Sequence, residues 1–119
     1  MANLASRSRG RWGEARAAAH FRSLGFEVLD RNWRSPVRSM PGELDLVVLG
    51  GGQIVFCEVK ARRSGSYGGA AHAVDANKQS RIRALAEAWL LEHRCGDVDV
   101  RFDVIAIDGV RLTHLESAF

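Results

Sequence analysis

The chain has little of the residue types that build small secreted or zinc-binding folds. Only two cysteines occur among its 119 residues, and Cys57 and Cys95 lack the close spacing of metal ligands. Cys57 lies within an apolar run, so we expect it to be a small buried hydrophobic residue. The four histidines show no ligand spacing either. Neither residue type predicts a metal site.

Long apolar runs are also missing. No segment approaches the ~18 consecutive apolar residues of a membrane-spanning helix, and the N-terminus lacks the apolar core of a secretory signal. Hydrophobic residues make up 46% and charged residues 26% of the chain, the balance of one ordinary globular domain. We therefore expect a soluble protein of the reducing cytoplasm that does not associate with membranes.

The charge is mildly basic, with a formal value of +3 and a pI of about 9.4. This permits a phosphate-bearing partner but is equally consistent with an ordinary solvated surface. Several arginines are candidate nucleic-acid contacts, and each of them fits a plain surface arginine equally well. They are Arg7, Arg9, Arg11, Arg34, Arg38, Arg62 and Arg63.

The hydrophobic periodicity predicts the element order helix, three strands, helix, two strands. Residues 1–9 indicate a basic arm, followed by a single domain over residues 10–119. The expected elements are a helix over 10–24, strands over 26–33, 43–49 and 54–61, a helix between the N-cap Asp75 and the terminator Gly96, and strands over 100–107 and 110–115. Pro36 and Pro41 mark a loop before the second strand. This order predicts an α/β fold in which two main helices flank a mixed sheet, with an antiparallel meander of the first three strands.

A glycine-rich turn, residues 50–53, predicts a hairpin with a four-residue loop and with Leu49 opposite Ile54. In that register Asp45 lies opposite Glu58, at a Cβ separation of about 4.5–5.5 Å that lets two carboxylates share one cation. Without a cation, partly buried like charges destabilise the sheet, so they call for a metal or a base. The alternative is a solvated strand end, with Glu58 paired to a nearby arginine.

Further charged residues are expected beside this pair. The same register places Glu43 opposite Lys60 and on the same face of the sheet. Glu14 interrupts the apolar stripe of the first helix, and Lys78 begins the apolar stripe of the second. The alternative is that each lies near a helix end and extends into solvent. Together these residues predict a polar pocket at the edge of an apolar core.

The residues of this hairpin resemble a known nuclease motif. Residues 42–47 (Gly-Glu-Leu-Asp-Leu-Val) and 55–62 (Val-Phe-Cys-Glu-Val-Lys-Ala-Arg) are similar to the D…E-x-K core of the PD-(D/E)XK, or restriction-endonuclease-like, superfamily. The wider pattern, from Gly10 to the C-terminus, resembles the bacterial YraN family. It includes Gly10-x-x-Gly13-Glu14, Arg31-Asn32-Trp33-Arg34, Lys78 and Arg101-Phe102-Asp103-Val104. Leu44 replaces the proline that often precedes the superfamily aspartate, but that proline does not contact the metal.

The resemblance implies a restriction-endonuclease-like αβββαβ(β) core, similar to archaeal Holliday-junction resolvases. It implies an endonuclease that uses Mg²⁺ (or Mn²⁺) to hydrolyse phosphodiester bonds in DNA, with branched or junction DNA among the candidate substrates. By analogy with the resolvases it also suggests a homodimer.

The resemblance also assigns roles to particular residues. Asp45, Glu58 and the Val59 carbonyl would hold the metal, and Lys60 would position the attacking water. Glu14 would reach the metal through water, and Lys78 would contact phosphate or the attacking water. Glu43 would either pair with Lys60 or support the metal ligands.

Two other functions fit the same residues. One is a nucleic-acid-binding module of the same fold without appreciable cleavage, although binding alone does not need two acids placed against phosphate. The other is an interaction protein in which the acids are surface groups.

Overall fold

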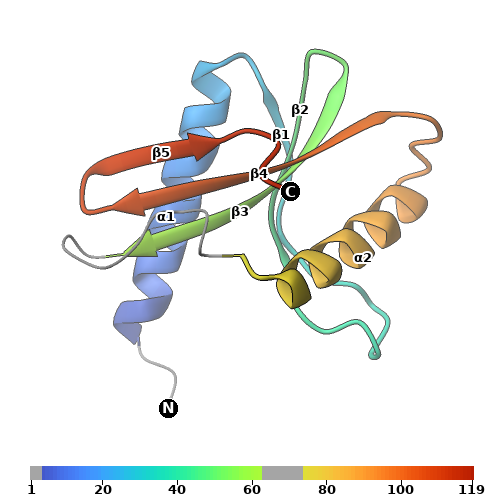
Figure 1. Ribbon diagram of the computed structural model, residues 1–119, viewed down its shortest axis with the longest axis horizontal. Coiled ribbons are helices and arrows are strands. Elements are labelled where there is room, and N and C mark those ends of the chain that lie inside the picture. The colour runs from blue at the N-terminus through green and yellow to red at the C-terminus, as the bar shows by residue number, and fades with distance from the viewer. Residues whose placement is uncertain (1–3, 63–73) are drawn as a thin grey trace.

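The computed structural model describes residues 4–62 and 74–119, which form a five-stranded mixed sheet with a helix on each face (Figure 1). The elements are α1 (Leu4–Ser23), β1 (Glu27–Trp33), β2 (Leu44–Gly50), β3 (Gln53–Arg62), α2 (Ala76–Glu92), β4 (Asp99–Asp108) and β5 (Arg111–Leu115). The predicted element order and the predicted α/β class are confirmed. Neither described helix is long and apolar enough to cross a membrane.

The strands lie in the sheet in sequence order, β1-β2-β3-β4-β5. The first three pair antiparallel, which confirms the predicted meander. β3 and β4 pair in parallel, so the chain must cross over between them, and α2 forms part of that connection. β4 and β5 form a final antiparallel hairpin.

Side chains of the central strands alternate between two apolar clusters. Val48, Val55 and Cys57 pack with Phe21 of α1 on one face of the sheet. On the other face, a second cluster packs against α2, and its strand residues include Val47, Ile54, Phe56 and Val104. The buried Cys57 confirms that this cysteine is a core residue.

The β2–β3 turn is shorter than expected. Gly51 and Gly52 alone form the turn, with φ of +58° and +77°, while Gly50 pairs with Gln53. Two consecutive residues with positive φ match the tight turns that follow the twist of a hairpin. The four-residue loop was therefore wrong, but adding one pair to the ladder leaves its register unchanged. Leu49 lies opposite Ile54, as predicted.

The first helix begins at Leu4 rather than near Gly10. Residues 4–9, which we expected to form a separate arm, are therefore helical. Gly10 was taken as a boundary, but a glycine inside a helix costs only about 0.5–1 kcal/mol, which neighbouring helix formers can offset. At the other end Gly25 has a φ of +89° and follows the last helical turn, as predicted.

Candidate functional site

Asp45 and Glu58 meet where the β2–β3 ladder ends. The ladder runs from Gly50–Gln53 to Leu46–Cys57, and Asp45 is the next residue along β2. Its Oδ2 accepts a hydrogen bond of 2.9 Å from the backbone N–H of Val59. Its carboxyl group also hydrogen bonds to that of Glu58. The structure thus brings the two predicted acids together.

These two carboxyl groups hold one proton between them. Burial raises the pKa of Asp45 to about 9, and its hydrogen bond to Glu58 and the negative charge of Glu58 contribute to that rise. Burial also disfavours charge on Glu58, but hydrogen bonds from Asp45 and Lys78 outweigh this and lower the pKa of Glu58. Asp45 is therefore protonated at neutral pH while Glu58 is ionised.

Lys78 and Lys60 neutralise this side of the site. Lys78 Nζ lies 2.8 Å from Glu58 Oε2, and the Asp75 carboxylate caps α2 by accepting from the Lys78 backbone N–H at 2.8 Å. The cap fixes the first turn of α2 and with it the position of Lys78. The pKa of Lys60 is lowered by its burial, by its hydrogen bond with Lys78 and by the positive charge of Lys78. Both predicted lysines lie beside the acid pair.

Glu14 reaches the site from α1 on a close helix–sheet contact. A Cβ on Gly13 would lie 2.8 Å from Cβ of Ala61 in β3, so only glycine allows this approach. Glu14 is 9% exposed, and its Oε2 accepts a 2.6 Å hydrogen bond from Asn32 Nδ2. Burial raises the pKa of Glu14, against the lowering effect of the Asn32 hydrogen bond.

Glu43 completes a group of three acids. Its Oε2 lies 3.2 Å from Arg34 Nη2, and its Oε1 accepts from Asn32 Nδ2 at 3.2 Å. One carboxylate oxygen each from Glu14, Glu43 and Asp45 lies within 4.8 Å of the others. We expected Glu43 either to pair with Lys60 or to support the metal ligands. Glu43 precedes β2, and its contacts with Arg34 and Asn32 do not include Lys60.

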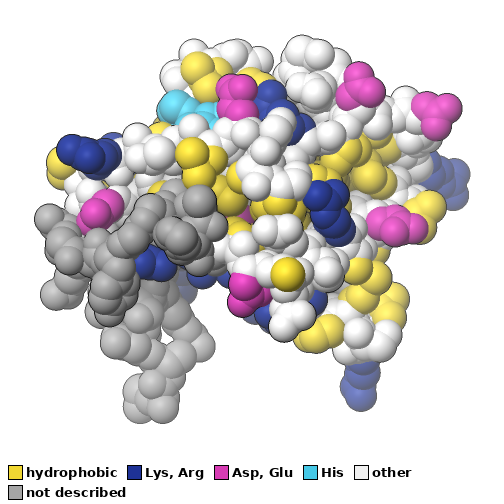
Figure 2. Space-filling model, viewed as in Figure 1, with side chains coloured by type: hydrophobic (Ala, Val, Ile, Leu, Met, Phe, Trp, Pro, Cys, Tyr) yellow, Lys and Arg dark blue, Asp and Glu magenta, His cyan; other side chains and the backbone are white. Residues whose placement is uncertain are grey.

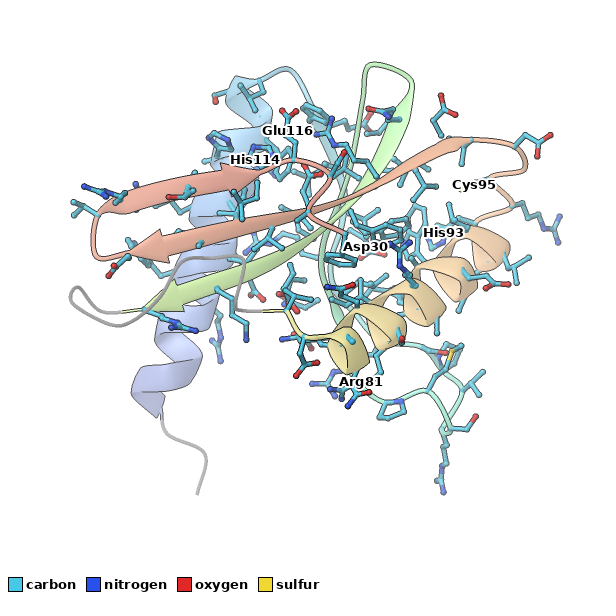
Figure 3. All side chains as sticks on the ribbon, viewed as in Figure 1. Asp30, Arg81, His93, Cys95, His114 and Glu116 are labelled. Carbon is cyan, nitrogen blue, oxygen red and sulfur yellow. The ribbon has the colours of Figure 1, made fainter. Side chains whose placement is uncertain are left out.

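A cleft of about 270 Å³ opens over Asp45, Glu58 and Lys78. It lies between the loop before β2 and the start of α2, where Figure 3 shows Arg81. Its lining residues are Pro41, Gly42, Glu43, Asp45, Glu58, Lys78, Arg81, Ile82 and Leu85. The cleft therefore combines acids, cations and an apolar wall in one open site.

The structure does not gather all predicted residues in this cleft, and neither Glu14 nor Lys60 lines it. Arg34 contacts it through Glu43, while Arg11 and Arg38 are exposed and do not line it. Arg62 ends β3, where its carbonyl accepts from Gly109 N–H at 3.0 Å. Arg63 and the side chains of Arg7 and Arg9 lie outside the described residues. The role of the Val59 carbonyl stays a prediction.

Two contributing residues were missed. Asn32 joins Glu14 to Glu43 and has a φ of +53°, a conformation that asparagine adopts more readily than most residues. Arg81 follows Lys78 by three residues, so helical spacing places both on one side of α2. Helical spacing from Lys78 was therefore enough to predict Arg81 as a site residue. Asn32 is identified only by its contacts with Glu14 and Glu43 in the folded structure.

The fold and the cleft define an α/β protein with a buried acid pair and adjacent lysines in an open site. The model of the uncharacterised protein family UPF0102 matches residues 13–107. A UPF0102 protein of Frankia casuarinae is 49% identical over 115 residues, covering 92% of this chain and 94% of the relative. A UPF0102 protein of Frankia alni is 45% identical over 124 residues, covering both chains completely. One of Rhodococcus opacus is 48% identical over 115 residues, covering 92% and 94%. The chain belongs to the UPF0102 family, which confirms its resemblance to the YraN family.

Proposed function

We propose that this protein is a metal-dependent endonuclease that hydrolyses phosphodiester bonds in DNA, within the restriction-endonuclease-like superfamily that its motifs resemble. One observation carries the proposal: acids from α1, from the segment before β2 and from β2 converge within 4.8 Å, in a site that also holds Lys78 and Lys60. The element order supports it, because it is the order that the resemblance implies. If these acids were ordinary surface groups, Glu58 would not need its ion pair with Lys78 and the pKa of Asp45 would not be raised.

The donor set fits a hard divalent cation. Carboxylate oxygens and water are the ligands that Mg²⁺ and Mn²⁺ prefer. Asp45 would hold the ion together with Glu58 and the Val59 carbonyl, with Glu14 and Glu43 close enough to support it. The raised pKa of Asp45 and of Glu14 fits this role, because a buried excess of acid calls for a positive charge. A bound ion would polarise the scissile phosphate and acidify a bound water.

The cations in and around the cleft have distinct roles in this proposal. Lys60 shares the acid-bearing side of β3 and would orient the attacking water and offset negative charge in the transition state. Lys78 is held against Glu58 at 2.8 Å, and it would turn to the phosphate once an ion takes over the charge of Glu58. Arg81 lines the outer cleft and would bind the neighbouring phosphate.

The decisive experiment is cleavage of a panel of linear, branched and gapped DNAs with Mg²⁺ or Mn²⁺. The wild-type protein should cut at least one of them, and Glu58→Ala should lose both metal binding and cleavage. Glu87→Gln, on the exposed side of α2, is the matched control for purification and for loss of charge. If the wild-type protein binds DNA but cuts none of the panel with either metal, it is a binding module instead.

A further inference from the structure

Trp12 is exposed on the turn of α1 that carries Glu14. Its side chain is 49% exposed, an unusual position for so large an apolar group. It precedes Gly13, whose contact with Ala61 holds this turn of α1 against the end of β3. The guanidinium of Arg16 lies 5.6 Å from the centroid of the Trp12 ring. Arg16 therefore helps to fix the indole while half of its surface remains accessible.

The β4–β5 turn continues this surface. Arg16 Nη2 donates a 2.5 Å hydrogen bond to the carbonyl of Val110, which is 86% exposed. Gly109 N–H donates to the carbonyl of Arg62 at 3.0 Å, which ties the same turn to the end of β3. Arg111 is the next exposed residue along the chain. We call Trp12, Arg16, Arg62, Val110 and Arg111 the Trp12 surface, and basic and hydrophobic side chains lie together over its turn at the left edge of Figure 2.

The Trp12 surface has more basic than acidic side chains. It contains three arginines, and Arg11 is exposed on the adjoining turn of α1. Asp108, opposite Arg62 and Arg111 in the strand registers, is the acidic residue of the β4–β5 turn. Glu14 is the only acid of α1 and is bonded into the site. An excess of arginine around an accessible indole complements a phosphate chain that carries aromatic bases.

The position of this surface relates it to the cleft. Trp12 precedes Glu14 by two residues in a helix, so the two side chains point in different directions. Arg62 follows Lys60 by two residues in β3. The surface is therefore two residues from the site along both α1 and β3, and Trp12 itself faces away from Glu14.

We propose that the Trp12 surface binds an unpaired strand of DNA, with one base stacked on Trp12 and the arginines on the flanking phosphates. In a duplex both faces of a base are covered by its neighbours, so an indole can stack only on an unstacked base. This inference rests on the proposed nuclease function and narrows its substrate to DNA with a single-stranded segment beside the scissile bond.

The test separates binding from cleavage. Anisotropy titrations in EDTA, with labelled single-stranded and blunt duplex DNA of equal length, compare wild type with Trp12→Ala, Trp12→Phe and Leu24→Ala. Leu24, 52% exposed near the other end of α1, is the matched control. Stacking losses predict about tenfold weaker single-strand binding for Trp12→Ala, a smaller loss for Trp12→Phe and no change for Leu24→Ala. Arg111→Ala should reduce the slope of log affinity against log salt by about 0.7.

Several outcomes overturn the inference. These are an unchanged single-strand affinity in Trp12→Ala, an equal loss on duplex DNA, or Trp12-dependent binding of an RNA strand in preference to DNA. Cleavage assays on gapped and blunt DNA keep the two proposals apart. Trp12-dependent binding without any cleavage overturns the nuclease alone. Equal cleavage of both DNAs by wild type and Trp12→Ala overturns the strand-binding inference alone.

Discussion

At the scale of single residues, the unusual feature is a carboxylic acid that stays protonated at neutral pH. Protonated Asp45 hydrogen bonds to the ionised Glu58 carboxylate, and its Oδ2 accepts from the Val59 N–H. An asparagine can make the same two contacts with nearly the same shape. The charge of Asp45 is therefore not needed for folding, which is expected of a residue kept for binding a cation.

We predict that Asp45→Asn stabilises the metal-free protein increasingly as pH rises from 5 to 8. Asp45 has a folded pKa of about 9 against an ordinary value of 3.8. Binding a proton at Asp45 stabilises the folded state. This contribution is complete below pH 3.8 and is lost as the pH rises toward about 9. Each pH unit in that window removes up to about 1 kcal/mol, and the variant does not titrate there.

Urea denaturation in EDTA at several pH values measures this difference. The pKa of Glu58 is lowered, so its effect belongs below about pH 4.5, outside the window. A variant that loses several kcal/mol at pH 8 would instead mark ionised Asp45 as a structural partner.

Lys60 is the residue with the sharpest catalytic prediction. Because it lies beside the acids without a described ion pair to either, Lys60→Ala should leave metal affinity nearly intact. Cleavage should fall by about 10²–10³-fold, the scale for losing one electrostatic stabiliser. Single-turnover cleavage with parallel metal titration measures both, and Glu87→Gln is the control. A small loss of cleavage together with a clear loss of folding stability in Lys60→Ala would indicate that Lys60 has only a structural role.

The positions of site residues were predicted correctly where those residues lie in regular strands. Strand alternation and the hairpin register suffice to bring Asp45, Glu58 and Lys60 together. The sequence pattern did not identify Asn32 or the partner of Glu43, because Glu43 lies before β2 and Asn32 has a left-handed backbone conformation. Neither feature follows from periodicity, since both depend on how the loop before β2 packs.

At the scale of elements, the contact of α1 with β3 decides where Glu14 lies. We predict that Gly13→Ala costs about 1–3 kcal/mol, because its new methyl group would lie 2.8 Å from Cβ of Ala61. The helix must move away, which carries Glu14 from the other acids and weakens metal binding. Thermal melts and metal titrations measure the two effects.

The chain offers a matched control and a rescue for this contact. Gly10→Ala lies in the same helix with nothing within 4 Å, so it should stabilise the protein by about 0.5–1 kcal/mol. Adding Ala61→Gly to Gly13→Ala should restore metal binding by reopening the space. If Gly13→Ala behaves like Gly10→Ala, the close approach does not position Glu14.

Element order and strand pairing were predictable because the central strands contain short apolar runs and the hairpin turns carry glycine. The start of α1 was not, since several residues before Gly10 are of N-cap type and no apolar stripe over 4–9 selects one of them. The close helix–sheet contact was also hidden. In the sequence Gly13 only lowers the helix propensity of its segment. The reason for a glycine at this position is its close approach to Ala61 of β3, which only the structure shows.

At the scale of the whole molecule, the site joins segments that are far apart in the chain. Glu14 comes from α1, Glu43 from the segment before β2, Asp45 from β2 and Glu58 from β3. Lys78 holds the start of α2 to this group through Glu58. In the metal-free protein the acids repel one another, and part of that repulsion is relieved by the proton on Asp45. A cation would remove the repulsion and link these elements together.

We therefore predict that Mg²⁺ or Mn²⁺ stabilises the folded protein. At a free concentration about 100-fold above Kd, ligand linkage contributes about 2.7 kcal/mol, which raises Tm by roughly 10 °C for a domain of this size. Differential scanning calorimetry with metal against EDTA measures the shift. Glu87→Gln should keep the full shift, Glu14→Gln should lose part of it, and Asp45→Asn or Glu58→Ala should lose most of it. An equal rise in all five proteins would show that the ions act on general surface charge and not at the acid cluster.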